Sequence, residues 1–546
     1  MLKNINNKFY ITVLFFAFYI SSLISYLTYD IMNSPDFNKY VNYFLYYSDI
    51  IESTNLEQGN LYFFLNYISF LFFENVNNLS PETNINLAVH SINNVVFLLG
   101  IYPLFLFLKQ KKFQLKNICM TLSLLCFLPI SFHIRGTLKP EILAFTLFSW
   151  ILYYISDYKT NKNTLIFVKI ILLSAILFTT KSSIAVMIGT VLLLELIINY
   201  RDLINRTNLS YVLILVIITS ALLMENYFIN DKFLTQVTHE EKYDNKASVE
   251  FLYNFNNDEF FDNPIKYSHY DSFLALTFFD TFGDIFGNYF NSEYSELNIE
   301  RKEFLILRDV NDTQKIPRLQ YEKEIKRFTY YANFEKIDLQ VSTIDNLRNL
   351  YGFLLSFLFY SLLILQGFLY NKKWRVLLLS PFLGIFFVVV SALGIFGNNF
   401  DPNIGDSVKV FYYSFLLLIA FPISFCLLLE FIKKGSKTFI ILLLILFLFI
   451  LGFPHSYGQG TQNSILYKNS TLITCEINYP IIDNIFGLDL DKDCDGSKLS
   501  KYNYKADFGN NFRYVFVNTP FLNLGIVFAS LLKLKIYKYF IKKDND

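Results

Sequence analysis

Long apolar stretches separated by short polar segments dominate the chain. An α-helix rises about 1.5 Å per residue and the hydrocarbon layer is about 30 Å thick, so roughly 17 to 25 apolar residues predict a membrane span. Twelve such stretches occur, near residues 9–29, 86–108, 117–134, 141–157, 164–180, 184–199, 209–228, 346–370, 376–397, 409–431, 438–453 and 519–538. The pattern predicts an all-α polytopic membrane protein with about 12 transmembrane helices. The short fifth and sixth stretches have a re-entrant pair as an alternative.

Composition agrees with this prediction. Only 17% of the 546 residues are charged and 53% are hydrophobic, whereas soluble domains have about 25% charged residues. The net charge of +1 gives no overall basic field that would indicate nucleic acid. The chain has no GxxxxGK[ST], GxGxxG, HExxH or GxSxG motif. The usual signatures of ATP-driven transport, dinucleotide chemistry and zincin proteolysis are therefore missing.

Lys and Arg concentrate in alternate connections between the predicted spans. They are frequent in segments 1–8, 109–116, 158–163, 200–207, 371–375, 433–437 and 533–546, whereas segment 30–85 holds only Lys39 beside seven acids. Positive residues near a span are retained on the cytoplasmic side. Both termini are therefore predicted to be cytoplasmic, and the polar segments 30–85, 229–345 and 454–518 to lie on the outer face.

This topology divides the chain into five parts. They are an N-terminal transmembrane module (1–228, with its outer loop 30–85), a large outer segment (229–345), helices eight to eleven (346–453), a second outer segment (454–518), and the last helix with a cytoplasmic tail (519–546). The large outer segment is too long to be structureless and predicts a small extracytoplasmic cap. The aromatic stretch 61–73 is too short to span and predicts an interfacial helix on the outer leaflet, with a re-entrant or core helix as the alternative.

The cysteines and the last outer segment offer weaker signals. Cys119, Cys126 and Cys426 fall in spans and are interpreted as packing residues. Cys475 and Cys494 share segment 454–518, and the sequence leaves open whether they form a disulfide. Segment 491–496 (DKDCDG) has the alternating acids of a calcium loop, but Tyr502 stands where a bidentate Glu is expected. A solvated acidic turn is favoured there, and no metal ligand is assigned.

Segment 33–40 (NSPDFNKY) follows the first span and contains the first candidate catalytic residue. Asp36 would lie just outside the membrane, where a carboxylate can take a proton from an acceptor hydroxyl. A phosphate leaving group departs without a general acid, so one carboxylate is enough, unlike the two needed in glycoside hydrolysis. The alternative, favoured by local sequence alone, is that Asp36 caps a helix or is a surface acid.

Cations also occur at predicted outer turns, against the usual charge bias. They lie in segments 133–141 (HIRGTLKPE), 180–183 (TKSS) and 405–413 (GDSVKVFYY). A charge within hydrocarbon costs roughly 2.5 to 3.5 kcal/mol on insertion scales. A lipid phosphate would compensate such charges. The alternatives are snorkelling or pairing with neighbouring acids such as Glu141 and Asp406. In the large outer segment, residues 280–290 (DTFGDIFGNYF) combine carboxylates with aromatic rings, which suits sugar binding without being specific for it.

Together these features resemble the GT-C superfamily of integral membrane glycosyltransferases, which includes protein O-mannosyltransferases and the lipid A aminoarabinose transferase. The resemblance covers the whole chain in architecture, and in motif it covers residues 34–40, 135–141, 283–289 and 406–413. It implies a polyprenyl-phosphate-sugar donor, a lipid, glycan or protein acceptor, and inverting transfer on the extracytoplasmic face.

The resemblance also implies residue roles. Asp36 would be the base and Lys409 would hold the lipid phosphate, with Arg135, Lys139 and Tyr413 as further phosphate-binding candidates. The candidate substrate contacts are Asp284, Tyr289 and Tyr40. This chain departs from several members because no paired acids follow its first span. The base assignment and a requirement for a divalent cation therefore stay open.

Two other functions remain as alternatives. A lipid-linked polysaccharide polymerase or ligase would use outer arginines for pyrophosphate, for which the chain offers Arg301, Arg308, Arg318 and Arg327. A transporter or flippase would show broken helices or buried charges at mid-membrane. The frequent Asn, Ile, Lys, Phe and Tyr suggest an AT-rich bacterial genome, and hence an inner (plasma) membrane location.

Overall fold

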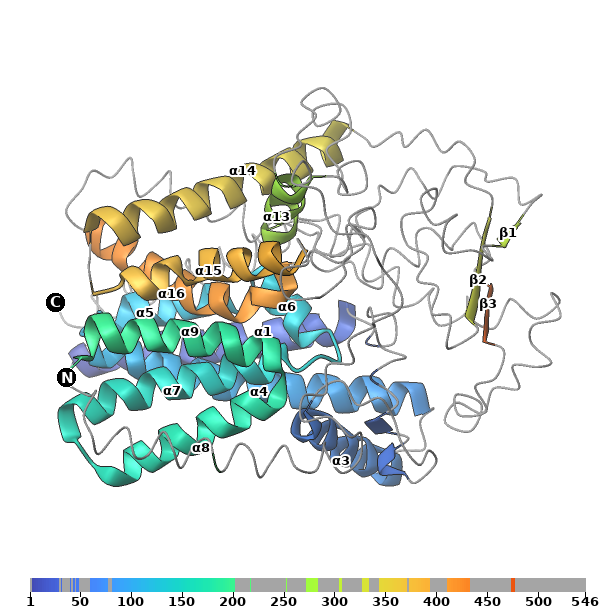
Figure 1. Ribbon diagram of the computed structural model, residues 1–546, viewed down its shortest axis with the longest axis horizontal. Helices are drawn as coiled ribbons and strands as arrows, with labels where there is room; N and C mark the ends of the chain where they lie inside the picture. Colours follow the sequence, from blue (N-terminus) through green and yellow to red (C-terminus); the bar gives the residue numbers. More distant parts are fainter. Residues whose placement is uncertain are drawn as a thin grey trace.

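The computed structural model describes the part of the chain that carries most of the predicted spans. The described residues are 2–28, 31, 40, 43–44, 46–48, 59–76, 81–201, 217, 252, 272–282, 304–306, 327–332, 343–370, 373–392, 410–432 and 473–476. Most of them are helical, and the long helices lie side by side in a bundle (Figure 1).

The helices follow the predicted spans closely. The first six and the eighth to tenth spans correspond to helical segments, while the eleventh, the twelfth and all of the seventh except Ile217 lie outside the described residues. The helices of the bundle are α1 (Leu2–Thr28), α4 (Pro81–Gln110), α5 (Leu115–Leu125), α6 (Pro129–Arg135), α7 (Glu141–Asn161), α8 (Thr164–Thr180), α9 (Ser182–Asn199), α14 (Thr343–Leu365) with its π-helical extension η6 (Gln366–Tyr370), α15 (Arg375–Ala392), and α16 (Ser414–Ile432) with the preceding 3-10 turn η8 (Val410–Tyr413).

Several described helices are suited to a membrane. Asn84–Gln110 and Val410–Glu430 are long and apolar enough to cross one, and the bent pair α5 and α6 adds a third if it forms one span. Helices α8 and α9 are shorter but apolar. Large apolar side chains such as Phe15, Phe357 and Phe386 are exposed on the outside of the bundle. Water would disfavour these exposed surfaces, whereas lipid would not, so the helices are compatible with a membrane protein.

The third predicted span is a broken helix instead of a continuous one. The axes of α5 and α6 differ by 61°. Leu128 is extended (φ −64°, ψ 142°) and Pro129 is the first residue of α6. Proline has no N–H, so it cannot bond the Leu125 carbonyl as a continuing helix would. The Leu128 N–H and the Ser131 hydroxyl donate to that carbonyl in its place.

The side chain of Arg135 donates hydrogen bonds to backbone carbonyls on both sides of the break. This arginine is fully buried, and its Nη2 donates to the Cys126 carbonyl at 2.7 Å while its Nε donates to the Ser131 carbonyl at 2.9 Å. Its Nη1 reaches Ser21 Oγ of α1 at 3.0 Å and Asn94 Oδ1 of α4 at 3.3 Å. One guanidinium therefore caps the end of α5 and joins it to α1, α4 and α6.

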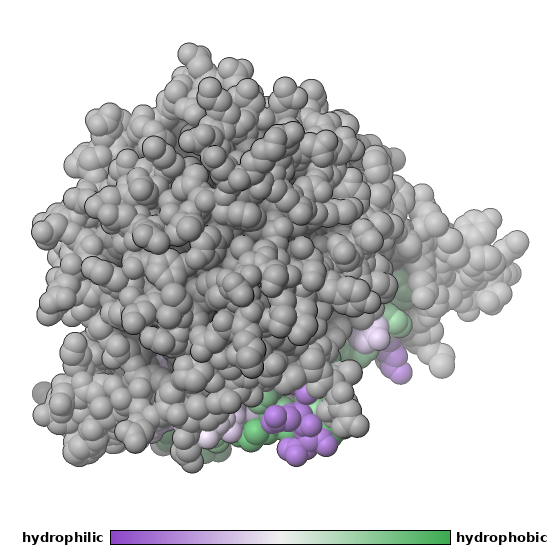
Figure 2. All heavy atoms as spheres, turned by 90° about the vertical axis from the view of Figure 1, so that its right-hand side faces the viewer, coloured by the Kyte–Doolittle hydropathy of each residue, from purple (hydrophilic) through white to green (hydrophobic). Residues whose placement is uncertain are grey.

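Helix α3 (Asn60–Val76) covers the stretch predicted as an interfacial helix, and it is three residues longer at its C-terminal end and one at its start. It packs against α4 near one end of the bundle (Figure 1). One face buries Tyr62, Phe63, Asn66 and Phe70, and the other exposes Leu61, Phe64, Ile68 and Phe72. This pattern suits a helix with protein on one side and an apolar environment on the other. Viewed from that end, both hydrophobic and hydrophilic described residues are visible along the lower edge (Figure 2).

Short strands add to the helical architecture. Strands β1 (Phe304–Ile306), β2 (Arg327–Ala332) and β3 (Ile473–Glu476) form an antiparallel sheet in that order, and they belong to the two long outer segments of the prediction. Cys475 lies in β3 opposite Phe328, whereas Cys494 and the acidic turn 491–496 lie outside the described residues. Cys119, Cys126 and Cys426 are buried free thiols, which confirms them as packing residues.

The Arg135 network predicts a stability effect. In Arg135→Met the acceptors of the guanidinium, among them the Cys126 carbonyl, lose these hydrogen bonds. Each unsatisfied buried acceptor costs about 1 to 3 kcal/mol. We expect a clear drop in the thermal midpoint of the detergent-purified protein, measured by fluorescence-detected size-exclusion chromatography. The control is Arg375→Met, because Arg375 is half-buried and its Nε donates to the Gly367 carbonyl. Equal midpoints for the two variants would contradict the network's role.

Candidate active site

Four elements that are distant in the sequence meet at one end of the bundle. Helix α6, η8 and α13 (Phe273–Phe282) contact one another there, close to the start of α7 (Figure 1). These elements carry or adjoin three of the motifs that resemble the GT-C superfamily. We call the residues that line this end, Tyr40, Lys139, Glu141, Lys181, Phe411, Tyr412 and Tyr413, the end cluster.

Lys139 lies at the centre of the end cluster. It is only 3% exposed and belongs to the short connection between α6 and α7. Its Nζ lies 5.9 Å from the ring centroid of Tyr40 and 5.2 Å from that of Phe411. An ammonium held over aromatic faces is attracted by about 0.5 to 2 kcal/mol, more when it is desolvated. Lys139 therefore joins Tyr40 of segment 30–85 to η8, which directly follows Lys409 in the sequence.

Tyr40 is positioned by stacked rings. Its ring lies 5.3 Å from that of Phe63 in α3, and Tyr43 stacks on the same Phe63 ring at 3.9 Å. All three side chains are buried. Offset stacking of this kind adds about 0.5 to 1.5 kcal/mol beyond burial. The stack fixes the end of the segment that contains Asp36 against α3.

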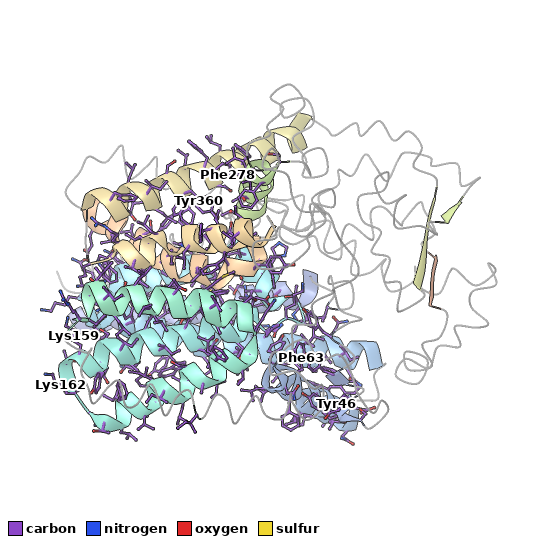
Figure 3. The ribbon with its side chains drawn as sticks, viewed as in Figure 1. Tyr46, Phe63, Lys159, Lys162, Phe278 and Tyr360 are labelled. Atoms are coloured by element: carbon purple, nitrogen blue, oxygen red, sulfur yellow. The ribbon has the colours of Figure 1, made fainter. Side chains whose placement is uncertain are left out.

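Tyr413 links η8 to α13, the helix that precedes motif 283–289. Its hydroxyl lies 3.2 Å from the Tyr360 hydroxyl of α14, which lies 3.0 Å from Thr281 Oγ1 of α13. Figure 3 shows Tyr360 and Phe278 facing each other between α14 and α13. Thr281 stands two residues before Gly283 and three before Asp284. On the other side of Tyr413, a Cβ at Gly384 would come within 2.4 Å of the Tyr413 Cβ, so η8 packs closely on α15 only with glycine there.

Glu141 and Lys181 form a buried ion pair beside Lys139. Glu141 Oε1 and Lys181 Nζ are 2.7 Å apart, with side chains 0% and 14% exposed. Glu141 is the first residue of α7, where the helix dipole favours a carboxylate. The Lys181 Nζ also lies 5.4 Å from the ring centroid of Tyr412. Among the described residues, Glu141 Oε2 has no hydrogen-bond partner.

The turn that carries Lys181 is hydrogen-bonded to segment 30–85. The N–H of Gly59 donates to the Thr180 carbonyl at 2.9 Å. A Cβ at Gly59 would come within 1.8 Å of the Thr179 carbonyl oxygen, so this approach needs glycine. The residue directly before α3 and the α8 to α9 turn are thereby held together.

A buried polar network supports the connection between α6 and α7. Asn93 Nδ2 donates to the carbonyls of Arg135 and Thr137, each at 2.8 Å. The Tyr62 hydroxyl donates to Asn93 Oδ1 at 2.7 Å. Burial raises the pKa of Tyr62 above its ordinary value, so the phenol stays neutral and keeps its proton for this bond. The backbone around Lys139 is therefore fixed from both α3 and α4.

The structure brings together only part of the predicted site. Lys139, Tyr40 and Tyr413 lie in the end cluster, whereas the guanidinium of Arg135 donates hydrogen bonds to protein atoms outside it. The remaining candidates, Asp36, Lys409, Asp284 and Tyr289, lie outside the described residues. Lys409 directly precedes Val410, the first residue of η8, and Asp36 precedes Tyr40 by four residues.

Other members of the site were not singled out as site residues from the sequence. For Lys181 the observed arrangement is the alternative to a phosphate contact, namely pairing with Glu141. The signal for it was a cation and an acid at neighbouring outer turns. The Tyr360 and Thr281 hydroxyls have no such signal, because a Tyr in an apolar span and a Thr in an apolar helix are ordinary core residues.

The described residues contain no group of three or more His, Cys, Asp or Glu side chains that could hold a metal ion. The divalent cation that the resemblance leaves open therefore stays open.

Comparison with known proteins gives no match for this chain. No protein-family model matches the chain, and neither a curated protein nor a solved structure matches it. The functional argument depends on the residues of the end cluster themselves.

The ion pair predicts a specific pattern of stability. Lys181→Met leaves the Glu141 carboxylate buried without its cation, which costs about 3 to 5 kcal/mol. We expect a large drop in the thermal midpoint for this variant, and recovery of much of it in the double variant Lys181→Met/Glu141→Gln, where the buried charge is gone. A double variant no more stable than Lys181→Met would show that the pair does not set this stability.

Proposed function

We propose that the chain is an integral membrane glycosyltransferase of the GT-C kind. It moves a sugar from a polyprenyl-phosphate-linked donor to a lipid, glycan or protein acceptor, with inversion, at the end cluster. The observation that carries the proposal is that Lys139 lies between Tyr40 and Phe411. Motifs 34–40, 135–141 and 406–413, which are far apart in the sequence, share one buried cation. The hydroxyl chain from Tyr413 to Thr281 brings α13, the helix that precedes motif 283–289, alongside.

The proposed reaction is a single displacement. The acceptor hydroxyl attacks the anomeric carbon, the carbon to oxygen bond to the phosphate breaks, and the electron pair leaves with the polyprenyl phosphate. Asp36 takes the hydroxyl proton as general base. Attack on the face opposite the leaving group inverts the anomeric centre.

Lys139 and Lys409 would stabilise the phosphate as its charge grows. A fixed cation in a site shielded from water stabilises developing charge more strongly than one in solution. Lys139 meets this requirement because it is almost fully buried and two rings hold its ammonium. Tyr40, the candidate substrate contact, would act here mainly by positioning this cation, because its buried ring lies between Phe63 and Lys139.

The charge distribution supports the proposed orientation. At the opposite end of the bundle cations are exposed, among them Lys109, Lys112, Lys159, Lys162 and Lys373, and Figure 3 labels Lys159 and Lys162 there. At the end cluster Lys139 is buried and Lys181 is partly buried. Exposed lysines at span ends mark the cytoplasmic side. The end cluster would then face outward, with both termini cytoplasmic and 12 spans in a bacterial plasma membrane.

A transporter is less well supported, although α5 and α6 form a broken helix. In transporters the freed backbone groups at such breaks face the substrate or coupling ion. Here the carbonyls of Leu125 and Cys126 are bonded by Ser131 and Arg135 of the same chain. For the polymerase alternative, Arg327 lies in β2, and Arg301, Arg308 and Arg318 lie outside the described residues.

The base assignment predicts a large loss of activity in Asp36→Asn. General base catalysis is typically worth about 10² to 10⁴ in rate, so transfer of radiolabelled sugar from polyprenyl-phosphate-sugar should nearly vanish in membranes containing this variant. Asp49→Asn, a change of another acid in the same outer segment, should retain activity. More than about a tenth of wild-type transfer in Asp36→Asn, with normal amounts of protein, would count against the assignment.

The phosphate role of Lys139 predicts a loss in kcat. Removing one preorganised charge contact typically costs about 10² to 10³ in rate, so Lys139→Gln should lower kcat about a hundredfold or more, and Lys139→Arg should retain a larger share. The control Lys162→Gln removes an exposed cation from the other end and should leave kcat unchanged. A Lys139→Gln enzyme that changes only in thermal midpoint would indicate a purely structural role.

A further inference from the structure

A second group of lysines lies at the end of the bundle opposite the end cluster, and the proposed reaction does not use it. Lys111 is in the turn between α4 and α5, Lys159 is near the end of α7, and Lys373 directly precedes Trp374 at the start of α15. Three separate connections therefore contribute one cation each to the same region. We call these three residues the lysine triad.

Two of these lysines share one aromatic ring. Lys111 Nζ donates to the Tyr200 hydroxyl at 2.7 Å and lies 5.1 Å from the ring centroid. Lys159 Nζ lies 5.0 Å from the same centroid and donates to the Asn199 carbonyl at 2.9 Å. Tyr200 itself is 5% exposed. The buried ring thus holds two ammonium groups near each other.

Lys373 is held next to them by the backbone and by a second aromatic group. Its carbonyl accepts a hydrogen bond from Asn199 Nδ2 at 3.0 Å, and its Nζ lies 5.2 Å from the ring of Trp374. The Trp374 ring packs on Phe113 at 5.3 Å and on Phe107 at 6.0 Å. The triad therefore has a fixed aromatic base.

The proximity of these charges is unfavourable without an anion. Burial and then the charge of Lys373 lower the pKa of Lys111 to about 8, with a smaller lowering by Lys159, while Glu195 acts in the opposite direction. Among the described residues, two neighbouring lysines and the Glu195 carboxylate act on Lys111. A bound phosphate would restore the charged form of Lys111 and reduce the repulsion.

We infer that the lysine triad binds the phosphate of an anionic phospholipid at the membrane surface. Lys111 directly follows the apolar helix segment Asn84–Gln110, which sets it at the depth of lipid headgroups. Next to Tyr200, the side chains of Ile197 and Ile198 are 49% and 50% exposed. A phospholipid satisfies both features, because its phosphate meets the lysines and its acyl chains cover the isoleucines. Free phosphate would satisfy only the first.

The test is lipid-dependent stabilisation of the full chain purified in detergent. Phosphatidylglycerol should raise the thermal midpoint and be retained in native mass spectra, and phosphatidylcholine should do neither. In Lys111→Gln/Lys373→Gln the apparent affinity for phosphatidylglycerol should fall about tenfold or more. The matched control Lys109→Gln/Lys169→Gln removes two exposed lysines with the same change in net charge and should keep the response.

Three results would overturn the inference. They are equal stabilisation by phosphatidylcholine, an undiminished response in the double variant, and full stabilisation by inorganic phosphate alone, which would assign the site to a free anion. If the double variant does not fold, Lys373→Gln replaces it, because Lys373 is exposed and its carbonyl contact is kept. Its affinity should still fall measurably, and an unchanged affinity would again overturn the inference.

Discussion

The buried guanidinium of Arg135 is the constraint on which the rest of the arrangement depends. A charged group among apolar helices is costly unless its donors are bonded. Here they bond the end of α5, the backbone of α6, and side chains of α1 and α4. These partners occupy fixed positions around one planar group. The break between α5 and α6 therefore has a defined geometry, even though a broken helix would otherwise leave free carbonyls in the bundle.

The position of the candidate active site follows from this constraint. Lys139 comes only four residues after Arg135, and Asn93 bonds the carbonyls on either side of Gly136. Tyr62 bonds Asn93 in turn, which attaches α3 to the same connection. Because α3 also carries Phe63, the stacked Tyr40 is brought over Lys139. A few buried polar contacts thus connect the first outer segment with the later turn η8.

Much of the helical framework could be predicted from the sequence, because spans depend on local runs of apolar residues. Helix α8 matches its predicted span exactly in residues 164–180, and the amphipathic α3 was expected from its aromatic stretch. The break before Pro129 was not predicted, because the hydropathy pattern does not show that proline lacks a backbone N–H. The pairing of Lys181 with Glu141 and the chain from Tyr413 to Thr281 depend on contacts between residues 40 to more than 50 positions apart. No local pattern specifies which of several outer charges and hydroxyls will meet.

The two ends of the bundle use lysines differently. At one end Lys139 is buried between aromatic rings, and Lys181 is partly buried and paired with Glu141. At the other end most of the described lysines are exposed. The central proposal is that Lys139 stabilises a lipid phosphate during sugar transfer. A cryo-EM map of the protein with bound polyprenyl phosphate tests it most directly. The account predicts phosphate density beside Lys139, between the rings of Tyr40 and Phe411. Density only at the opposite end, or between helices away from the end cluster, would contradict it.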